Sequence, residues 1–373
     1  MTTEPFVFSD EQHLLRETVR DACQRAWPPE AVERTANGPW ATKFWTTLAS
    51  ELGVVGLTVP ETLGGLGAGV VDLTIVAEEL GRVAAAAPML GTTLATETLA
   101  RVECETAATV LEPVAGGQRL AALVVTDDAG AWTPDRPATT ARSEGDGWRI
   151  DGAARGVLDG AGADDLLVLS TTDEGIALML VDGAADGVTR RAVDTMDLTR
   201  ELADVTFTDA QATLLQVGPA VVDAVRGAAD VATIVLAAEQ LGGCQTMLDR
   251  TVEHARTHMQ FGRPIGTFQA VRHRCADMLV ATEHARSAVY HAAWAADVGI
   301  DDVAVAASLA HVVASQAHTE VSGGALQLHG GIGFTWEHPT HLYLKRAWSD
   351  ATLLGGRAFH RARLAPLLEP PRA

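Results

Sequence analysis

Apolar side chains recur at helical spacing in roughly the first 105 residues. Leu15, Val19 and Cys23 follow one another at intervals of four, which places them on one face of a helix. Ser9 precedes this run and Gln12 stands three positions later. Such a pair caps the first turn of a helix reciprocally, so a helix is predicted to begin directly after Ser9.

A segment rich in glycine and proline interrupts the helical region. Helical spacing continues over residues 44–52, and residues 54–67 then contain Pro60 and several glycines. Glycine and proline break regular structure, so this segment is predicted to be a loop. Helical spacing resumes over residues 70–82.

Short apolar runs separated by turn signals replace the helical pattern after residue 119. Residues 120–125, 166–169 and 176–181 are predicted strands. Asp-Gly pairs favour tight turns, and they occur at Asp146-Gly147, Asp151-Gly152, Asp159-Gly160 and Asp182-Gly183. Helices of the kind that connect parallel strands are missing from this pattern. A small antiparallel β domain is therefore expected rather than a Rossmann unit.

Long helices return after about residue 217. Continuous helical patterns cover residues 228–256, 270–298 and 303–328. The order helices, strands, helices predicts an α+β protein. The expected domains are an N-terminal helical domain at 1–118, a middle β domain at 119–213 and a C-terminal helical bundle at 214–373.

The charge of the chain limits its partners. With 48 acidic and 28 basic side chains, the formal net charge is −20. Nonspecific nucleic-acid binding depends on lysine and arginine neutralising phosphates, so no nucleic-acid partner is expected. A ligand with phosphates of its own would need a local basic cluster, such as Arg272 and Arg274, or the surface of a partner chain.

A reduced, non-membrane environment is expected. The chain is 47% hydrophobic, but no uninterrupted apolar stretch approaches the length of a membrane span. The first 12 residues do not resemble a secretory leader. The spacing of the four cysteines indicates neither a disulfide framework nor a metal site; they are Cys23, Cys104, Cys244 and Cys275. Cytoplasmic location and no membrane insertion follow as expectations.

Two segments about 60 residues apart carry a family resemblance. Residues 258–269 read HMQFGRPIGTFQ, and residues 327–337 read QLHGGIGFTWE. Together they resemble the C-terminal domain of acyl-CoA dehydrogenases, which binds FAD across a subunit interface. The resemblance implies that family's fold, with an N-terminal helical domain, a central antiparallel β domain and a C-terminal four-helix bundle. It also implies an acyl-CoA substrate and a protein that accepts electrons from the flavin.

The resemblance assigns cofactor contacts to five residues, which are Phe261, Gln269, Gln327, Gly330 and Gly331. An aromatic ring offers a stacking face, and an amide offers both a donor and an acceptor. Adjacent glycines allow backbone N–H groups to approach a phosphate or sugar closely. The alternatives are that Phe261 packs in the core, that Gln269 is a helix-surface residue and that the glycines form a helix C-cap.

Several positions depart from the family pattern. His258 stands where the family usually has an arginine that pairs with the FAD pyrophosphate, and a neutral imidazole holds phosphate less well than a guanidinium. Residues 126–132 match the family's flavin-facing stretch only in outline. Gly156 and Leu158 replace an aromatic and a threonine that lie against the flavin ring. Glycine cannot stack, and leucine cannot form a hydrogen bond with flavin.

The family's catalytic base is also replaced. The reaction removes a proton next to a thioester carbonyl, which requires a carboxylate with a raised pKa. The usual glutamate position falls on Leu354, and an alternative position on an earlier helix falls on Ala232. Glu239 and Asp350 are the carboxylates that could take the role instead. No catalytic residue is assigned, and no metal site is expected.

The favoured function is that of one subunit of a flavin-dependent acyl-CoA dehydrogenase. In this hypothesis, a paralogous partner supplies the base and shares the FAD in an α2β2 heterotetramer. The family includes such heteromers in actinobacterial steroid side-chain degradation, which suggests a bulky sterol-derived thioester. Two alternatives stay open: a self-sufficient homotetramer with a relocated base, and a non-enzymatic scaffold.

Overall fold

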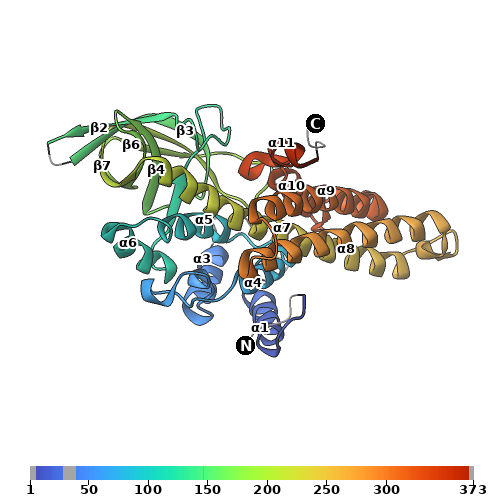
Figure 1. Ribbon diagram of the computed structural model, residues 1–373. Coiled ribbons are helices and arrows are strands. Elements are labelled where there is room, and N and C mark those ends of the chain that lie inside the picture. The colour runs from blue at the N-terminus through green and yellow to red at the C-terminus, as the bar shows by residue number, and fades with distance from the viewer. Residues whose placement is uncertain (1–5, 28–38, 146, 369–373) are drawn as a thin grey trace, which may run out of the picture.

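The protein has three parts, which are visible in a computed structural model that describes residues 6–27, 39–145 and 147–368 (Figure 1). N-terminal helices and a β domain occupy one end of the molecule. A bundle of long helices extends away from them to the other end. The predicted α+β class and the order of the parts are confirmed.

The N-terminal part consists of helices joined by short turns. Ser9 and Gln12 form the expected capping box at the start of the first helix. The segment 54–67 contains two short 3-10 turns, and the helix over residues 70–82 begins and ends as predicted. The elements are α1 (Asp10–Ala26), α3 (Pro39–Thr46), η1 (Thr47–Glu51), η2 (Val54–Gly56), η3 (Glu61–Leu63), α4 (Val70–Arg82), α5 (Met89–Leu99) and α6 (Glu105–Ala115).

Seven strands form the sheet of the β domain. The sheet runs in the order β1-β4-β2-β3-β7-β5, with β6 beside β7, and the pairing of β4 with β5 closes part of it into a ring. The strands are β1 (Ala121–Val124), β2 (Thr139–Glu144), β3 (Gly147–Leu158), β4 (Asp165–Thr172), β5 (Gly175–Asp182), β6 (Val188–Ala192) and β7 (Leu202–Val217).

Three details of the β domain differ from the expectations. Most pairs are antiparallel, but β4 pairs in parallel with β1 and β2, because β2 and β3 intervene between β1 and β4 in the chain. Asp151 and Gly152 lie inside β3 at a shift in register rather than in a turn. β7 continues to Val217, beyond the expected end of the domain at 213. The turns at Asp159 and Asp182 are present, whereas Asp146 lies outside the described residues.

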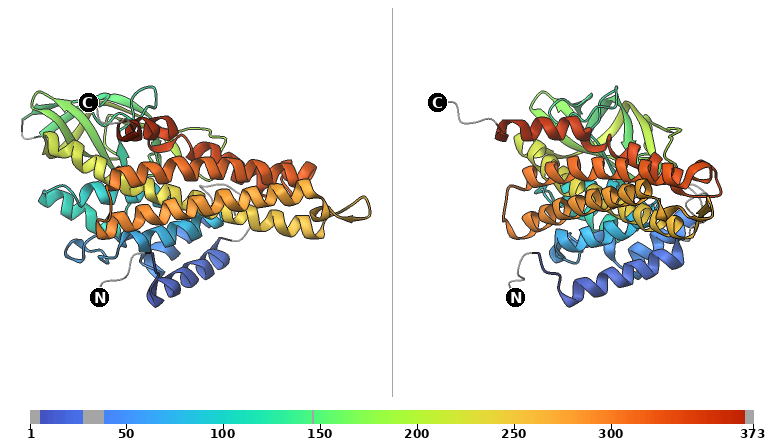
Figure 2. Two further views of the ribbon diagram at one scale, coloured as in Figure 1. Left: turned by 45° about the vertical axis from the view of Figure 1, so that its right-hand side comes forward. Right: turned by 90° about the vertical axis from the view of Figure 1, so that its right-hand side faces the viewer.

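Three long helices dominate the C-terminal part. They are α7 (Pro219–Thr257), α8 (Gln269–Val298) and α9 (Val303–His329). A two-stranded hairpin, β8 (Met259–Gln260) with β9 (Arg263–Pro264), follows α7 at the far end of the bundle (Figure 2). The shorter elements are η4 (Ile265–Thr267), η5 (Gly330–Phe334), α10 (Thr340–Asp350), η6 (Leu353–Gly355) and α11 (Gly356–Leu368), of which α10 and α11 pack against α9.

Glycines allow α4 and α7 to cross at very short range. A Cβ on Gly81 would lie 2.0 Å from the Glu239 carbonyl oxygen, and a Cβ on Gly242 would lie 2.0 Å from that of Glu78. No side chain tolerates such contacts. The two backbones therefore touch directly, which fixes the N-terminal part against the bundle.

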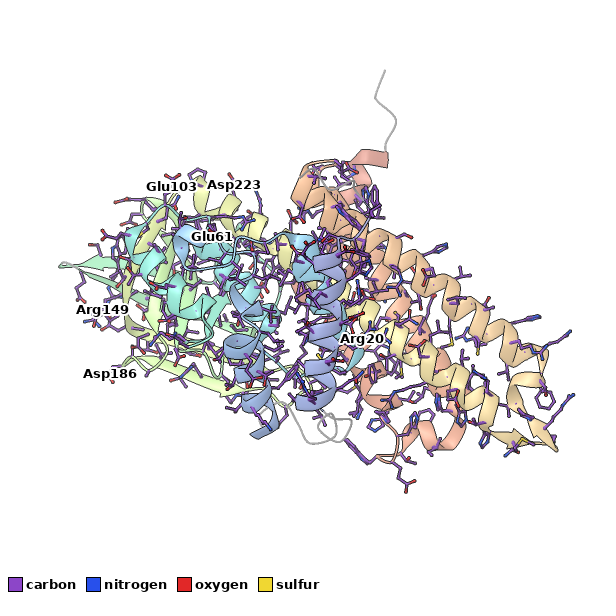
Figure 3. All side chains as sticks on the ribbon, turned by 90° about the horizontal axis from the view of Figure 1, so that it is seen from below. Arg20, Glu61, Glu103, Arg149, Asp186 and Asp223 are labelled. Carbon is purple, nitrogen blue, oxygen red and sulfur yellow. The ribbon has the colours of Figure 1, made fainter. Side chains whose placement is uncertain are left out.

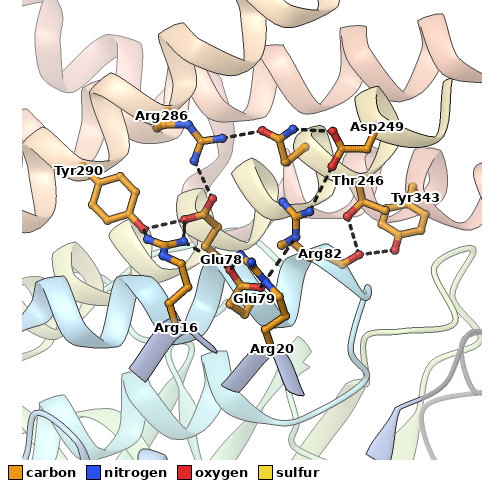
Figure 4. Close-up of polar contacts among 11 residues, drawn as sticks. Arg16, Arg20, Glu78, Glu79, Arg82, Thr246, Asp249, Arg286, Tyr290 and Tyr343 are labelled. Carbon is orange, nitrogen blue, oxygen red and sulfur yellow. Dashed lines mark hydrogen bonds and ion pairs between the residues drawn. The ribbon is translucent and has the colours of Figure 1, made fainter. Parts of the chain in front are cut away.

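A polar network joins α1, α4 and the bundle next to this crossing (Figure 4). Glu78 is buried and accepts hydrogen bonds from Arg16, Arg286 and Tyr290 at 2.6–2.7 Å. The two arginines lower the pKa of Glu78 against the cost of its burial. Glu78 is thus a paired structural carboxylate that joins three helices.

Many charged side chains lie on the outside of the molecule. Figure 3 shows Glu103, Arg149 and Asp186 at its periphery, while Arg20 projects from α1. No helix in the described part of the chain is long and apolar enough to cross a membrane.

Candidate functional site

Two adjoining cavities lie between the β domain, α7 and the start of α11. The inner cavity has a volume of about 440 Å³ and the outer cavity about 580 Å³. Trp132, Leu354 and Phe359 line both of them. The position that the sequence comparison equates with the catalytic base therefore stands where the cavities meet.

The inner cavity has an apolar lining. Its walls include Leu94 on α5, Leu123 on β1 and Leu158 on β3, and no ionisable side chain of the described residues lines it. Gly156 also faces it, with a φ of +64° and no atom within 4 Å of the position that a Cβ would take. The space left by the missing aromatic side chain is thus not refilled by a neighbour.

Arginines surround the outer cavity. Arg136, Arg226 and Arg363 line it. Arg226 is 2.6 Å from Asp135, and Arg363 is 2.7 Å from Asp230, so both are partly neutralised. Arg136 forms no ion pair with any described residue. Arg226 also lies 3.7 Å from Asp223, so Arg136 is the one arginine of this cavity that is left to meet an anionic ligand among the described residues. Arg272 and Arg274, the basic cluster suggested by the sequence, line neither cavity.

Leu354 is held in an uncommon backbone conformation. Its φ of +51° is in the left-handed region that leucine rarely adopts. The His360 ring lies further along the chain, with Nε2 at 3.2 Å from the Leu354 carbonyl oxygen and Nδ1 at 3.1 Å from the Ser308 hydroxyl. Burial lowers the pKa of His360 to about 4, so the ring is neutral near pH 7. His360 therefore fixes the turn that carries Leu354, and its low pKa makes it a weak proton acceptor.

The two replacement carboxylates belong to a buried ion-pair cluster. Glu239 accepts hydrogen bonds from Arg200 and Arg346, the latter at 2.9 Å, and Arg200 also donates to Asp350 at 3.0 Å. All four side chains are at most 3% exposed. Burial raises the pKa of Asp350 to about 6, although both arginines oppose this.

This cluster argues against a catalytic role for either acid. Neither Glu239 nor Asp350 lines the two cavities. Glu239 is also tied to two guanidinium groups, which makes it a poor proton acceptor, because its protonation would leave the buried cations uncompensated. Asp350 has a raised pKa, but it is enclosed in the same cluster, away from both cavities. Ala232 is fully buried and lines neither cavity.

The five predicted cofactor residues lie at the opposite end of the bundle. Phe261 is at the tip of the β8–β9 hairpin, and Gln269 begins α8. Gln327, Gly330 and Gly331 are at the end of α9 and the start of η5. All five are exposed, and Phe261 is 89% exposed, so it is not a core residue.

The exposed glycines fit contact with another molecule. Gly331 lacks a positive φ, and nothing lies within 4 Å of the position that its Cβ would take. Neither local backbone geometry nor packing within the chain requires glycine there. The backbone at this position is therefore open to close approach by a ligand or a second chain. Phe261, with its φ at +53°, is also presented outward, and its ring contacts Phe268 edge to face at 6.1 Å between ring centroids.

The two ends of the bundle are too far apart to serve one cofactor. Thr233 lines the outer cavity, and His254 lies level with the end of α9. These residues are about 30 Å apart along α7 at a rise of 1.5 Å per residue. A single chain therefore cannot place its cavities and its exposed glycines on the same flavin.

The fit to FAD differs between these ends. At the far end, the exposed aromatic ring, the amides and the open glycine backbone suit the adenosine and phosphate portions of a dinucleotide. At the inner cavity, Gly156 and Leu158 offer neither a stacking face nor a hydrogen bond. The two family contacts are therefore lost at these positions, and the aromatic rings and hydroxyl groups that line the cavity instead are those of Trp132, Phe359, Thr126 and Thr352.

Comparisons with known proteins agree with this architecture. The family models for the acyl-CoA dehydrogenase N-terminal and C-terminal domains match residues 9–118 and 222–366. Acyl-CoA dehydrogenase IpdE2 of Mycolicibacterium smegmatis is 34% identical, over 93% of this chain and 95% of that protein.

Two solved structures of paired chains are also similar. One chain of the ChsE4–ChsE5 complex from Mycobacterium tuberculosis superposes with a TM-score of 0.87 at 28% identity, over 99% of this chain and 100% of that one. A variant of the Tcur3481–Tcur3483 steroid acyl-CoA dehydrogenase gives a TM-score of 0.84 at 30% identity, over 96% and 98%.

The chain belongs to the acyl-CoA dehydrogenase family. The members of this family are FAD-dependent oxidoreductases that act on CH–CH groups.

Proposed function

We propose that this chain is the base-lacking subunit of an acyl-CoA dehydrogenase built from two different chains. In this assembly a paralogous partner supplies the catalytic carboxylate and the contacts to the flavin ring. The present chain supplies Phe261, Gln269 and the segment 327–331 to the partner's FAD. The proposed assembly is an α2β2 heterotetramer in the cytoplasm. An electron-transfer acceptor reoxidises its flavin.

One observation carries the proposal: the inner cavity is lined by no ionisable side chain among the described residues. Desaturation needs a group that accepts the proton next to the thioester carbonyl. Leu354 occupies the corresponding position, and Glu239 and Asp350 are paired with Arg200 and Arg346. The similarity to chains of the ChsE4–ChsE5 and Tcur3481–Tcur3483 proteins supports pairing with a second kind of chain.

The proposed substrate is an acyl-CoA thioester with a bulky, ring-containing acyl group. The steroid acyl-CoA dehydrogenase among the similar structures supports this class. Arg136 would complement a phosphate group of CoA if the CoA portion of the substrate lies along the outer cavity.

The test is to express the chain alone and together with the product of a neighbouring homologous gene. Oxidation of an acyl-CoA by the purified pair, and none by this chain alone, supports the proposal. Oxidation by the isolated chain would favour the self-sufficient homotetramer. A stable pair that holds no flavin and oxidises no thioester would favour the scaffold.

A further inference from the structure

Four histidines form a continuous column at the far end of the bundle. The ring centroids of His258 and His254 are 4.6 Å apart, those of His254 and His329 are 4.5 Å apart, and those of His329 and His338 are 4.5 Å apart. The first two pairs are stacked face to face. We call these four residues the histidine column. It lies beside Gly330 and Gly331, whose backbone is open to the outside.

The column is not arranged as a metal site. Stacked rings direct their nitrogen atoms sideways from the stack, whereas a metal requires nitrogen lone pairs that converge on one point. In agreement, no group of three or more His, Cys, Asp or Glu in the described chain is placed to hold a metal ion.

The charges around the column are positive. Arg250 on α7 is half-buried, forms no ion pair with a described residue, and acts on both His329 and His338. The histidines also act on one another, and His341 on α10 acts on His338. No carboxylate is among the main influences on His254, His329 or His338. Protonation of these three histidines therefore adds to the positive charge that already surrounds them.

Burial and mutual repulsion lower the pKa values of three of the four histidines. The pKa values of His254 and His329 are lowered, and that of His338 is lowered to about 4, in each case mainly by burial. The Nδ1–H of His329 donates to the Ala325 carbonyl oxygen at 2.8 Å, which leaves its Nε2 free to accept a proton. These histidines thus bind protons weakly in the isolated chain, and we expect them to take up a proton when an external anion binds beside them.

The polarity of α7 and α9 disfavours an anion at the column, and proton uptake counteracts this effect. α7 ends at Thr257 and α9 ends at His329, so the column stands at two helix C-termini. Helix C-termini carry partial negative charge and disfavour anions. Protonated imidazoles reverse the local sign and donate hydrogen bonds to phosphate oxygens.

We infer that the histidine column and Arg250 form a proton-coupled binding site for the pyrophosphate group of a dinucleotide. This inference extends the proposed cofactor contact. It depends on the proposed function only for the statement that the bound pyrophosphate belongs to FAD. Binding of the anion raises the proton affinity of the column, and by reciprocity protons raise the affinity for the anion. The contact to the shared cofactor therefore strengthens as the pH falls.

The test is calorimetric titration of the isolated full-length chain with ADP-ribose. Its pyrophosphate is a diester that does not titrate between pH 6 and pH 8, so any proton taken up belongs to the protein. The expected result is about tenfold tighter binding at pH 6 than at pH 8, as linkage requires when roughly half a proton is taken up per ligand over this range. Repeating the titration in two buffers of different ionisation enthalpy counts that proton.

Variants separate the column from general effects of pH. His258→Arg replaces an exposed column member with a permanent charge, so ADP-ribose should bind more tightly at pH 8 and depend less on pH. His258→Gln and Arg250→Gln should weaken binding. His284→Gln, on an exposed face of α8, is the matched control and should change nothing. Sodium sulfate, tested in parallel, shows whether a simple anion suffices or the dinucleotide is required.

The inference is overturned if ADP-ribose does not bind the isolated chain, if its affinity is independent of pH, or if His258→Gln binds like the wild type. These outcomes do not affect the proposed function, which depends on thioester oxidation by the paired chains. Conversely, a pair that fails to oxidise thioesters leaves the pH dependence of ADP-ribose binding intact.

Discussion

The partners of a carboxylate decide whether it is structural or catalytic, and Glu239 is the example in this chain. From the sequence, Glu239 is a lone acid on an apolar helix, which is compatible with a base. In the structure it is one of four charges in a closed cluster, because Arg200 arrives from the β domain and Arg346 from α10. The contacts of Glu239 with these two arginines could not be predicted from residue spacing, because the three residues come from three separate segments of the chain.

Replacing Glu239 should therefore destabilise the protein rather than disable its chemistry. Glu239→Gln leaves two buried arginines with one carboxylate, and we expect a loss of about 3 kcal/mol in unfolding free energy. Urea denaturation measures this. Glu253→Gln, an exposed position on the same helix, should stay within about 0.5 kcal/mol of the wild type. Unchanged stability of Glu239→Gln with loss of turnover in the pair would return Glu239 to the role of base.

Asp159 gives a pH-dependent prediction. Burial raises its pKa from 3.8 to about 7. Well below pH 3.8 both folded and unfolded chains hold this proton. Between the two pKa values only the folded chain holds it, so stability falls as the pH rises, and the full cost is present above the folded-state pKa.

Asp159→Asn removes that cost. We expect it to raise the unfolding free energy at pH 8 by roughly 1–3 kcal/mol and to change it little at pH 4. Asparagine also suits the φ of +56° at this position. Asp173→Asn, at an exposed turn, is the control. An equal effect of Asp159→Asn at both pH values would show that ionisation of Asp159 is not the cause.

Helices and strands could be predicted from the sequence where a single hydrophobic periodicity extends over the whole segment. The helices over residues 70–82 and 270–298 agree with their patterns to within one residue. Asp151-Gly152 shows the limit, because the pair is compatible with a turn and with a shift in register inside a strand. The same limit applies to the cavities: Leu354 and the stretch 126–132, which ends at Trp132, were located from the sequence, but His360 and the arginines around the outer cavity were not. Their roles depend on which elements meet, and no local motif marks them.

The crossing of α4 and α7 can be tested with two glycines. Gly242→Ala would place a Cβ 2.0 Å from the Glu78 carbonyl oxygen, so the helices must separate. We expect a loss of about 3 kcal/mol in unfolding free energy. Gly323→Ala, inside α9 with nothing within 4 Å, should instead raise it by about 0.5–1 kcal/mol. Similar effects for both would mean that helix propensity, and not the crossing, decides.

At the scale of the whole molecule, α7 separates two functional surfaces. Its N-terminal half lines the outer cavity, and its C-terminal end carries the histidine column and leads to the exposed Phe261. A separation of about 30 Å along this helix means that each surface requires a second chain to complete a cofactor site. In the proposed assembly, the chain keeps the surface that it offers to a partner, and Gly156, Leu158 and Leu354 stand where the groups that would serve its own cavity are expected.

The flavin content of the purified protein tests this account most directly. Absorbance of released FAD, divided by chain concentration, should be close to zero for the isolated chain. For the co-expressed pair it should equal one flavin for each pair of unlike chains, since only the partner's cavity holds a ring. An isolated chain that purifies with a full complement of FAD would contradict the account.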